Sequence, residues 1–427
     1  MSRIYSVWKL LRAWASPRRL RPTLREMKTP MHRREFCSIL ATAALARAVR
    51  AADPPKDVRI TRAVGFDLAC KRSKVAGRNA RLDVHGDRTT DRMVRLFTNT
   101  GAEALGNCRA DGKAVAQLIG KDPFSFYRRD DTAMSGPLGV GTMPLWDLLA
   151  KLVEKPAYEL LGGKGPEKVL VYDGSIYFAD LLPQYADKWQ DRFREEIDMG
   201  LAIGHRAFKI KIGRGYKWMP RKEGDARDVA VVKTIRKHAG PDVLLGVDAN
   251  NGYDLAGAKR FLEQAGDEKL MFVEEMFPET VDDCLALKEF IKERGWKTLV
   301  ADGETQGDLN VFKPFIGAKA IEVLQADMNR FGFEGILTEA AWAREQGLQV
   351  APHNWGSLVG YYMQLHVGRA IDNFYRAEHD PLSTPVLVAE GYTRKDGATT
   401  VPNMSGFGLS INEKAFAAEA KMRFDVN

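Results

Sequence analysis

The sequence predicts an α/β fold, a (β/α)8-type barrel with a second region before it, and three observations indicate this class. Eight short apolar runs recur along the chain and alternate with charged stretches of helical spacing. Most of the runs are rich in Val, Ile, Leu and Phe, as strands buried on both faces of a parallel sheet are. Polar residues follow the runs all round the series, which favours a closed barrel over an open doubly wound sheet with one switch point.

The predicted elements follow one another as repeating strand-helix units. The eight strands are expected at residues 169–177, 207–213, 243–250, 270–277, 298–304, 321–328, 348–355 and 373–380. Helical spacing is clearest at residues 226–238, 255–265 and 281–294.

The chain has 427 residues, more than the about 250 of a minimal barrel, so a second region is expected before residue 160. Its expected content is a strand near residues 59–69, a basic loop at 71–81, a strand near 93–98 and helices between 113 and 157. A hairpin-like stretch, residues 399–410, is expected to return to it.

The formal net charge of +8 comes from the first 52 residues, which hold 12 Lys or Arg against 2 acids. The rest of the chain is slightly acidic, so nucleic acid is not an expected partner. Arg33-Arg34-Glu35-Phe36 precedes an apolar stretch and small-residue cleavage patterns, which resembles a bacterial twin-arginine export signal starting at about residue 31. Periplasmic export is therefore expected, although Cys37 stands where that pattern usually has Leu. The alternatives are a basic tail on a cytoplasmic protein and a true start at Met31.

Membrane insertion and cysteine chemistry are not indicated. No apolar run approaches the ~20 residues needed to span a bilayer. Cys70, Cys108 and Cys284 would remain after signal cleavage, an odd number without paired spacing, which predicts neither a disulfide framework nor a cysteine metal site.

Three carboxylates stand where apolar runs break: Asp248, Glu274 and Glu304. They are 26 and then 30 residues apart, roughly one βα unit each, so each is expected to end its own strand on the same rim. Carboxylate oxygens suit Mg²⁺ or Mn²⁺ and argue against zinc. Each acid has a neighbour that could replace it: Asn250 beside Asp248, Glu275 beside Glu274, and Asp302 beside Glu304.

Lysine and histidine side chains are expected to face this rim. In the strand around residues 208–212, Lys209 and Lys211 share one face. An ammonium near another cation has a lowered pKa and can act as a base, so either lysine is expected to tune the other. Asp327 and His353 end consecutive strands on the far side, and an Asp–His pair is typical of a general acid/base. Glu378, at the end of the last strand, completes the ring.

Taken in order, the lysines, the three acids, the Asp327–His353 pair and Glu378 resemble the enolase superfamily, in the subgroup typified by mandelate racemase. Residues 143–151 followed by 155–163 resemble the family's helix leading into the barrel, and Gly406-Phe407-Gly408 resembles its closing segment. The resemblance covers roughly residue 57 to the end. The loop at residues 213–225 departs from it by lengthening the stretch between the lysines and Asp248.

The resemblance implies an organisation and a chemistry. It implies an N-terminal α+β capping domain at residues 57–165, a modified (β/α)7β barrel at 166–398 and a C-terminal segment at 399–427 that returns to the cap. It implies Mg²⁺, with Mn²⁺ as a substitute, bound by Asp248, Glu274 and Glu304, and a homo-oligomer. A small-molecule carboxylate would chelate the metal while a Lys or His base removes the proton α to it, forming an enediolate. The implied catalytic residues are Lys209, Lys211, Asp327, His353 and Glu378, and Asn250 is expected to contact the substrate.

Two opposed bases allow dehydration or racemisation. We expect dehydration of a sugar acid to a 2-keto-3-deoxy acid, because the subgroup includes many dehydratases and the basic residues of the loop at 71–81 suit a polyhydroxylated acid; a solvated surface is the other interpretation of that loop. A racemase or epimerase of a 2-hydroxy acid is the alternative. An exported acid-sugar binding protein with a retired site is the non-enzymatic alternative. A metal-dependent hydrolase is disfavoured, because residues 169–177 contain no His-x-His pair.

Overall fold

The computed structural model describes residues 55–128 and 132–427. The predicted export signal, including Arg33 and Arg34, lies outside the described residues. In the described part of the chain, no helix combines the length and apolar character that crossing a membrane requires.

Eight parallel strands of the described chain form a closed barrel, and the first seven pair with one another in sequence order. The circle closes where the last strand pairs with the first and where Val350 bridges Phe374. The strands are β6 (Lys168–Ile176), β7 (Ala207–Lys211), β8 (Leu244–Asp248), β9 (Leu270–Glu274), β10 (Leu299–Asp302), β11 (Val323–Leu324), β12 (Gln349–Val350) and β13 (Ala377–His379). All eight fall within the predicted runs or within one residue of them.

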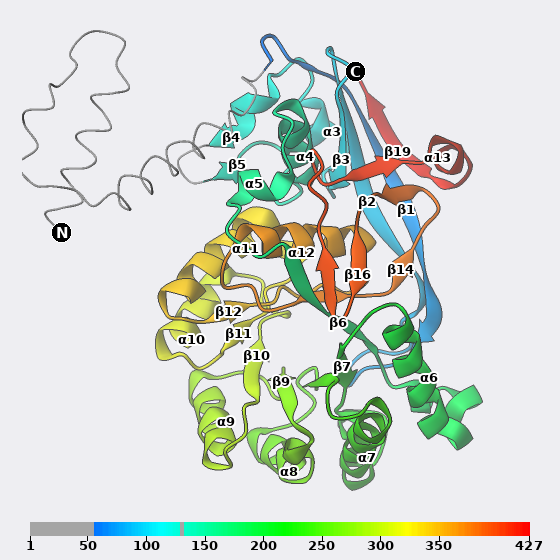
Figure 1. The fold of residues 1–427 in the computed structure, drawn as a ribbon, viewed down its shortest axis with the longest axis vertical. Helices are drawn as coiled ribbons and strands as arrows, with labels where there is room; N and C mark the ends of the chain where they lie inside the picture. Colours follow the sequence, from blue (N-terminus) through cyan, green and yellow to red (C-terminus); the bar gives the residue numbers. More distant parts are fainter. Residues whose placement is uncertain (1–54, 129–131) are drawn as a thin grey trace, which may run out of the picture. The chain divides into compact units, whose positions relative to one another are not determined.

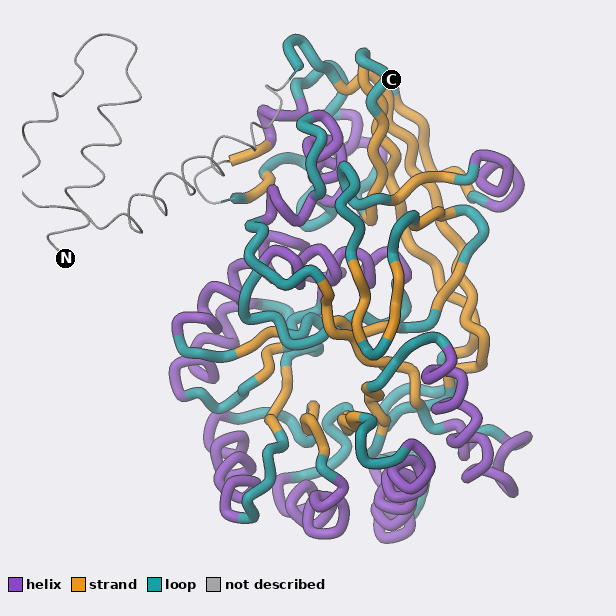
Figure 2. The backbone as a smooth tube through the Cα atoms, in the orientation of Figure 1, coloured by secondary structure: helices purple, strands orange, loops and turns teal. Residues whose placement is uncertain are grey.

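Seven helices connect these strands and lie outside them (Figure 2). They are α6 (Trp189–Ala202), α7 (Arg221–Ala239), α8 (Leu255–Ala265), α9 (Val281–Glu293), α10 (Phe312–Ala318), α11 (Met328–Glu345) and α12 (Leu358–Ala370). Side chains of Asp254, Thr280, Asp327 and Ser357 accept main-chain N–H groups and so cap α8, α9, α11 and α12. The arrangement is a (β/α)7β barrel, and the predicted fold class is confirmed.

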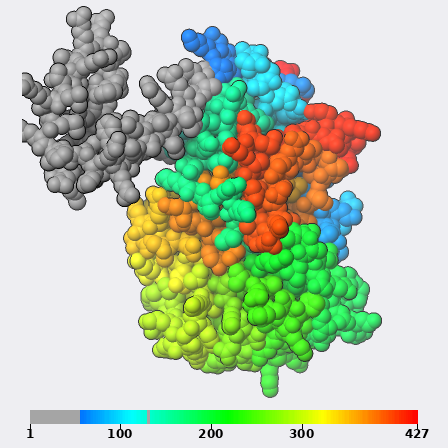
Figure 3. Space-filling model, viewed as in Figure 1, coloured from blue at the N-terminus to red at the C-terminus, as the bar shows by residue number. Residues whose placement is uncertain are grey.

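A second, antiparallel sheet is built on the first long strand, β1 (Ile60–Ala76). It continues through β2 (Gly86–Thr98) and β3 (Glu103–Asn107), while two later strands, β14 (Leu382–Ser383) and β19 (Lys421–Val426), both pair with β1. The C-terminal segment therefore lies beside the first strands of the described chain, as the labels in Figure 1 and the red and blue surfaces in Figure 3 show. We call this sheet and the helices beside it the cap.

The smaller elements complete the cap and its junction with the barrel. The helices are α3 (Gly112–Ala116), α4 (Met143–Leu152), α5 (Ala157–Leu161) and α13 (Glu413–Glu419). The short strands are β4 (Tyr127–Arg128), β5 (Ala133–Met134), β15 (Leu387–Ala389), β16 (Thr393–Lys395), β17 (Ala398–Thr400) and β18 (Leu409–Ile411). Short 3-10 helices are η1 (Pro123–Phe126), η2 (Ala179–Leu181), η3 (Pro183–Lys188), η4 (Arg214–Tyr216), η5 (Gly266–Glu268) and η6 (Leu309–Val311).

Two expectations about the cap differ from the structure. Residues 71–76 of the expected basic loop belong to β1, because Arg72 and Lys74 occupy buried positions of the strand and find acidic partners there. Residues 399–410 do not form a hairpin with one another. Thr399 pairs with Arg394 of β16 on one side and Val169 of β6 on the other, while β18 pairs with β15.

Glu334 of α11 connects the barrel to the cap. Its carboxylate accepts hydrogen bonds from the indole N–H of Trp146 (3.0 Å), the hydroxyl of Thr142 (2.9 Å) and the main-chain N–H of Met134 (3.1 Å). The cap also approaches α11 at Gly332, where φ is +62° and an added Cβ would lie 2.5 Å from the carbonyl oxygen of Val140. The contact therefore requires glycine.

Replacing Glu334 with Ala is expected to lower the free energy of unfolding by about 1–3 kcal/mol, because the buried indole N–H of Trp146 loses its acceptor. Glu345→Ala, an exposed change on the same helix, is the control and is expected to cost less than about 0.5 kcal/mol. Urea unfolding measures both variants. Equal stabilities would show that Glu334 does not hold the cap to the barrel.

Candidate active site

Three carboxylates meet at the C-terminal ends of adjacent barrel strands. Asp248 ends β8, Glu274 ends β9, and Glu304 follows β10 by two residues. One oxygen of each lies within 4.8 Å of the others, and the first two acids are fully buried. Because the strands are parallel neighbours, their ends bring residues that are distant in sequence into one cluster. We call these residues the acid triad.

Lys209 and Lys211 approach the acid triad from β7. Lys209 Nζ lies 2.7 Å from Glu274 Oε1, 2.7 Å from Glu378 Oε1 and 3.3 Å from Asp248 Oδ2. Lys211 forms an ion pair with Asp248, and its Nζ lies 5.3 Å from the ring centre of Tyr177. Three carboxylates therefore hold Lys209, whereas one holds Lys211.

The expected lowering of the lysine pKa values is wrong for this structure. Burial lowers the pKa of Lys209, but Glu274 and Glu378 outweigh burial and hold the pKa well above its usual value. Burial also lowers the pKa of Lys211, and Lys209 lowers it a little further, but Asp248, Tyr177 and Glu304 together outweigh these effects, so this pKa is raised too. The sequence suggested two cations side by side, whereas the fold surrounds them with more acids than cations.

Asp327 and His353 form a hydrogen-bonded pair on the other side of the barrel. His353 Nδ1 lies 2.7 Å from Asp327 Oδ2, so this nitrogen carries the proton and donates it to the carboxylate. Nε2 therefore faces the acid triad, 2.9 Å from Glu304 Oε2. Burial lowers the pKa of His353, but Glu304 and Glu378 raise it well above its usual value.

Glu378 lies between Lys209 and His353. Its Oε2 is 3.9 Å from His353 Nε2 and accepts the main-chain N–H of Asn354 at 2.8 Å. Gln364 of α12 holds the main chain of Glu378 at both its N–H (2.9 Å) and its carbonyl (3.2 Å). The sequence had no signal for Gln364. Gln325, which donates to Glu274 Oε2 at 2.8 Å, was also missed, although it stands two residues before Asp327 in the same strand pattern.

The neighbouring polar residues take other positions. Asn250 donates its side-chain amide to Glu304 Oε1 (3.0 Å) and Glu275 Oε2 (3.1 Å), so the structure places it beside the triad. Burial raises the pKa of Glu275 well above its usual value, and the nearby Glu304 raises it further. Burial likewise raises the pKa of Asp302, with further increases from Glu279 and Glu304. Neither carboxyl belongs to the three whose oxygens converge within 4.8 Å of one another.

The basic residues of the cap are mostly engaged in holding it to the barrel. Arg72 forms a two-pronged pair with Asp380, with its Nε 2.8 Å from Oδ1 and its Nη2 2.6 Å from Oδ2. Lys74 Nζ lies 2.6 Å from Glu196 Oε2 of α6, and both pairs are almost fully buried. The sequence allowed two interpretations of this loop, a solvated surface or a substrate contact. The structure agrees with neither interpretation for Arg72 and Lys74. Removing one partner from such a pair costs about 3–5 kcal/mol.

An aromatic group from the cap and the barrel stands next to Lys211. The rings of Tyr177 and Trp355 stack with centres 4.4 Å apart, and His85 of the cap accepts the indole N–H of Trp355 at 3.1 Å. Burial and the nearby Lys211 lower the pKa of His85 to about 4, so its ring is neutral. Sequence reasoning missed these residues, because none of the three lies in a recognisable motif.

The long loop after β7 holds the cap loop in place. The indole N–H of Trp218 donates to the carbonyl of Asn79 at 2.7 Å, and Lys217 Nζ donates to the carbonyl of Arg81 at 3.1 Å. Arg81 in turn donates to the main-chain carbonyl of Asn250 at 2.7 Å, two residues after Asp248. The loop at residues 213–225 therefore connects the cap to the acid triad.

The triad fits a divalent cation. It offers only carboxylate oxygens, the donors that Mg²⁺ and Mn²⁺ prefer. Burial raises the pKa of Glu274 to about 8, because Lys209 only partly offsets burial and Asp248 adds to the rise. Positive charge at this point would favour the ionised carboxylate.

Comparison with known proteins agrees with this geometry. The sequence profile of the family described as "Enolase C-terminal domain-like" matches residues 192–415. The chain is 28% identical to D-galactarolactone cycloisomerase of Agrobacterium fabrum over 368 residues, 77% of this chain and 91% of that protein.

Two solved structures resemble the fold closely. Galacturonate dehydratase of a Geobacillus species, in complex with D-galacturonate and 5-keto-4-deoxy-D-galacturonate, superposes with a TM-score of 0.78 at 29% identity, covering 87% of this chain and 100% of that one. A mandelate racemase/muconate lactonizing protein of Geobacillus sp. Y412MC10, in complex with magnesium and tartrate, gives a TM-score of 0.78 at 30% identity, covering 87% and 97%.

Replacing Trp218 with Phe is expected to speed amide hydrogen exchange in residues 79–85 by up to about tenfold, because one hydrogen bond of about 0.5–1.5 kcal/mol is lost. Hydrogen–deuterium exchange with mass spectrometry measures this, and Trp342→Phe on α11 is the control. Unchanged exchange in that segment would mean that Trp218 does not fix the cap loop.

Proposed function

Because the chain belongs to the enolase superfamily and is mandelate racemase-like, we propose that it is a Mg²⁺-dependent enzyme that dehydrates a sugar acid. The enzyme removes the proton α to the carboxylate to form an enediolate, and loss of the β-hydroxyl then gives a 2-keto-3-deoxy acid. Relatives act on such molecules, among them the galacturonate dehydratase of a Geobacillus species and the arabinonate dehydratase of Saccharolobus solfataricus.

One observation carries this proposal: Lys211 and His353 stand at opposite sides of one cluster of buried carboxylates. Lys211 pairs with Asp248 from β7, while His353 lies 2.9 Å from Glu304 after β12. In the circle of strands these two positions are separated by four strands one way and two the other. A sugar acid bound between them would place its α-carbon beside one group and its β-hydroxyl beside the other.

We assign the base to Lys211. Lys209 is fully buried and paired with three carboxylates, so its proton is held in place and its charge supports the site. Lys211 has one carboxylate partner and borders the aromatic group at Tyr177. It accepts a proton only as the neutral amine, so its ion pair with Asp248 must loosen when substrate binds.

We assign the acid to His353. Asp327 fixes its tautomer through Nδ1, which leaves Nε2 as the nitrogen that exchanges a proton with the substrate. Protonation of the β-hydroxyl turns it into water, a much better leaving group. Glu378, 3.9 Å from Nε2 and 2.7 Å from Lys209, positions both cations.

The metal is proposed to be held by Asp248, Glu274 and Glu304, with Asn250 beside them to contact the substrate. A bound Mg²⁺ or Mn²⁺ would supply the positive charge that stabilises the anion formed on proton removal. The three acids come from three different strands, so the barrel itself fixes their spacing.

Isomerisation is the second candidate function, and a specific observation favours it. The A. fabrum relative is a cycloisomerase, and two opposed proton-exchanging groups also permit reprotonation from the other face. The same Lys211 and His353 would act in both reactions, and the products distinguish them.

The wider context of the chain is also proposed. We propose that residues 1–52 direct export to the periplasm, because they contain Arg33-Arg34 before an apolar stretch. We propose that residues 57–165 and 399–427 form the capping domain over a barrel at 166–398, supported by the pairing of β19 with β1, and that the mature enzyme is a homo-oligomer.

Lys211→Ala and His353→Asn are each expected to lower 2-keto acid formation from a responsive sugar acid by about 10²- to 10⁴-fold, because each removes a proton-transfer group. Lys233→Ala and His238→Asn, exposed changes on α7, are the controls and should keep wild-type rates. Full activity in both site variants would exclude this mechanism. Binding of sugar acids without Mg²⁺-dependent turnover would support the binding-protein alternative instead.

Glu274→Gln is expected to weaken Mg²⁺ binding at least about tenfold, or 1.4 kcal/mol, because it removes a charged ligand. Glu275→Gln is the matched control: this neighbouring carboxyl lies outside the group of converging acids and should leave Mg²⁺ affinity nearly unchanged. Isothermal titration with MgCl₂ measures both. The reverse order of effects would move the metal site to Glu275.

A further inference from the structure

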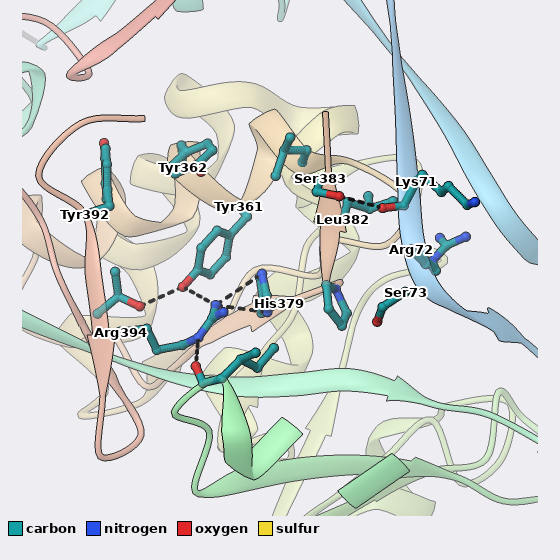
Figure 4. Close-up of a pocket in the computed structure, with 14 residues that line it drawn as sticks. Lys71, Arg72, Ser73, Tyr361, Tyr362, His379, Leu382, Ser383, Tyr392 and Arg394 are labelled. Carbon is teal, nitrogen blue, oxygen red and sulfur yellow. Dashed lines mark hydrogen bonds between the residues drawn. The ribbon is translucent and has the colours of Figure 1, made fainter. Parts of the chain in front are cut away.

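A second cavity lies outside the barrel mouth, behind the strand that carries Glu378. It has a volume of about 650 Å³ and is enclosed by α12, the end of β13, the β16–β17 hairpin, β14 and β1 (Figure 4). Successive side chains of β13 point to opposite faces of the strand: Glu378 pairs with Lys209 inside the barrel, whereas His379 lines the cavity. The strand β13 therefore separates the cavity from the active site. The volume falls within the range of small-molecule pockets, about 300–1,000 Å³.

Arg394 of β16 brings an uncompensated positive charge to this cavity. Its Nε donates to the carbonyl of Ile203 at 2.8 Å, and its Nη1 lies 3.5 Å from the hydroxyl of Tyr361 and 3.1 Å from His379 Nδ1. Each of these partners is uncharged, and within residues 55–128 and 132–427 no carboxylate forms an ion pair with Arg394. Its Nη2 has no hydrogen-bond partner in that part of the chain.

The histidines around Arg394 do not balance its charge. Burial, Arg394 and His205 hold the pKa of His379 well below its usual value, and burial lowers the pKa of His205 to about 4. The two rings are joined by a hydrogen bond of 3.0 Å between His205 Nε2 and His379 Nδ1. Both are neutral near pH 7, so the positive charge of the inner wall is that of Arg394.

Aromatic and hydroxyl groups form the other walls. The rings of Tyr362 and Tyr392 pack with centres 4.8 Å apart, and Figure 4 shows them on the side of the cavity opposite Lys71. The hydroxyl of Tyr362 has no hydrogen-bond partner among the described residues, whereas that of Tyr361 bonds to Thr399 at 2.7 Å. Lys71 lies at the rim with its side chain 63% exposed and its Nζ 3.9 Å from Asp87 Oδ2.

We propose that this cavity is a second binding site, for a small organic carboxylate of hydroxy-acid size, whose carboxylate pairs with Arg394. A guanidinium offers two parallel N–H donors to a carboxylate, and Nη2 is available for one of them. Tyr362 supplies a hydroxyl for the ligand's own hydroxyl groups, and the tyrosine rings cover its carbon face. Binding here needs no divalent metal, so it is independent of the proposed reaction.

The test is isothermal titration of the full chain with D-gluconate in EDTA. Arg394→Gln should weaken binding at least tenfold relative to wild type, whereas Arg344→Gln, an exposed arginine paired with Asp372 at 3.7 Å, should not change it. Ile203→Trp provides a second variant that keeps Arg394. Residue 203 is 41% exposed at the cavity edge, so an indole there should block entry without disturbing the fold.

Four results would overturn the proposal. Equal affinity in wild type, Arg394→Gln and Ile203→Trp would place the bound gluconate elsewhere. No binding to wild type would show that the cavity does not take this ligand. Tighter binding of inorganic phosphate than of gluconate would make this an inorganic-anion site. Equal binding of uncharged D-glucose would show that Arg394 does not select an anion. Mg²⁺-dependent turnover is measured separately, so none of these results bears on the proposed reaction.

Discussion

The mutual neutralisation of buried charges at the barrel mouth is the constraint on which the rest of the structure depends. Five carboxylates, Asp248, Glu274, Glu304, Asp327 and Glu378, surround three basic groups, Lys209, Lys211 and His353. If all were ionised, two negative charges would remain unbalanced, and the pKa of Glu274 rises to about 8 under burial. A divalent cation would supply the balancing positive charge, so this excess of negative charge favours metal binding.

Rigid elements hold these charges in place. The triad occupies the ends of consecutive parallel strands, where a barrel exposes side chains without exposing its core. The cap is fixed over this rim by the buried Arg72–Asp380 pair and by the bonds from Trp218 and Arg81. The hydrogen bonds of Gln364 hold the main chain of Glu378 from behind. Few of these supporting residues touch the proposed substrate position, yet they determine where the proton-transfer groups stand.

The barrel was predictable from sequence because most of its strands are continuous apolar runs that end at a polar residue. For the same reason Asp248, Glu274 and His353 could be singled out, since each stands where such a run ends. Pairing between distant residues was not predictable. The sequence indicated a basic loop at Arg72 and Lys74, but these residues form ion pairs with Asp380 and Glu196, which lie more than a hundred residues away in sequence. The raised lysine pKa values were missed because they depend on how many acids the fold gathers. The aromatic group at Trp355 left no periodic signal.

The central claim is that this charge cluster removes a proton α to a carboxylate with the help of a divalent metal. The most direct measurement is proton NMR in D₂O of sugar acids incubated with the enzyme, with Mg²⁺ or with EDTA. The account predicts Mg²⁺-dependent loss of the α-proton signal, in step with or faster than product formation. Product formation with the α-proton retained, or equal exchange in EDTA, would contradict it.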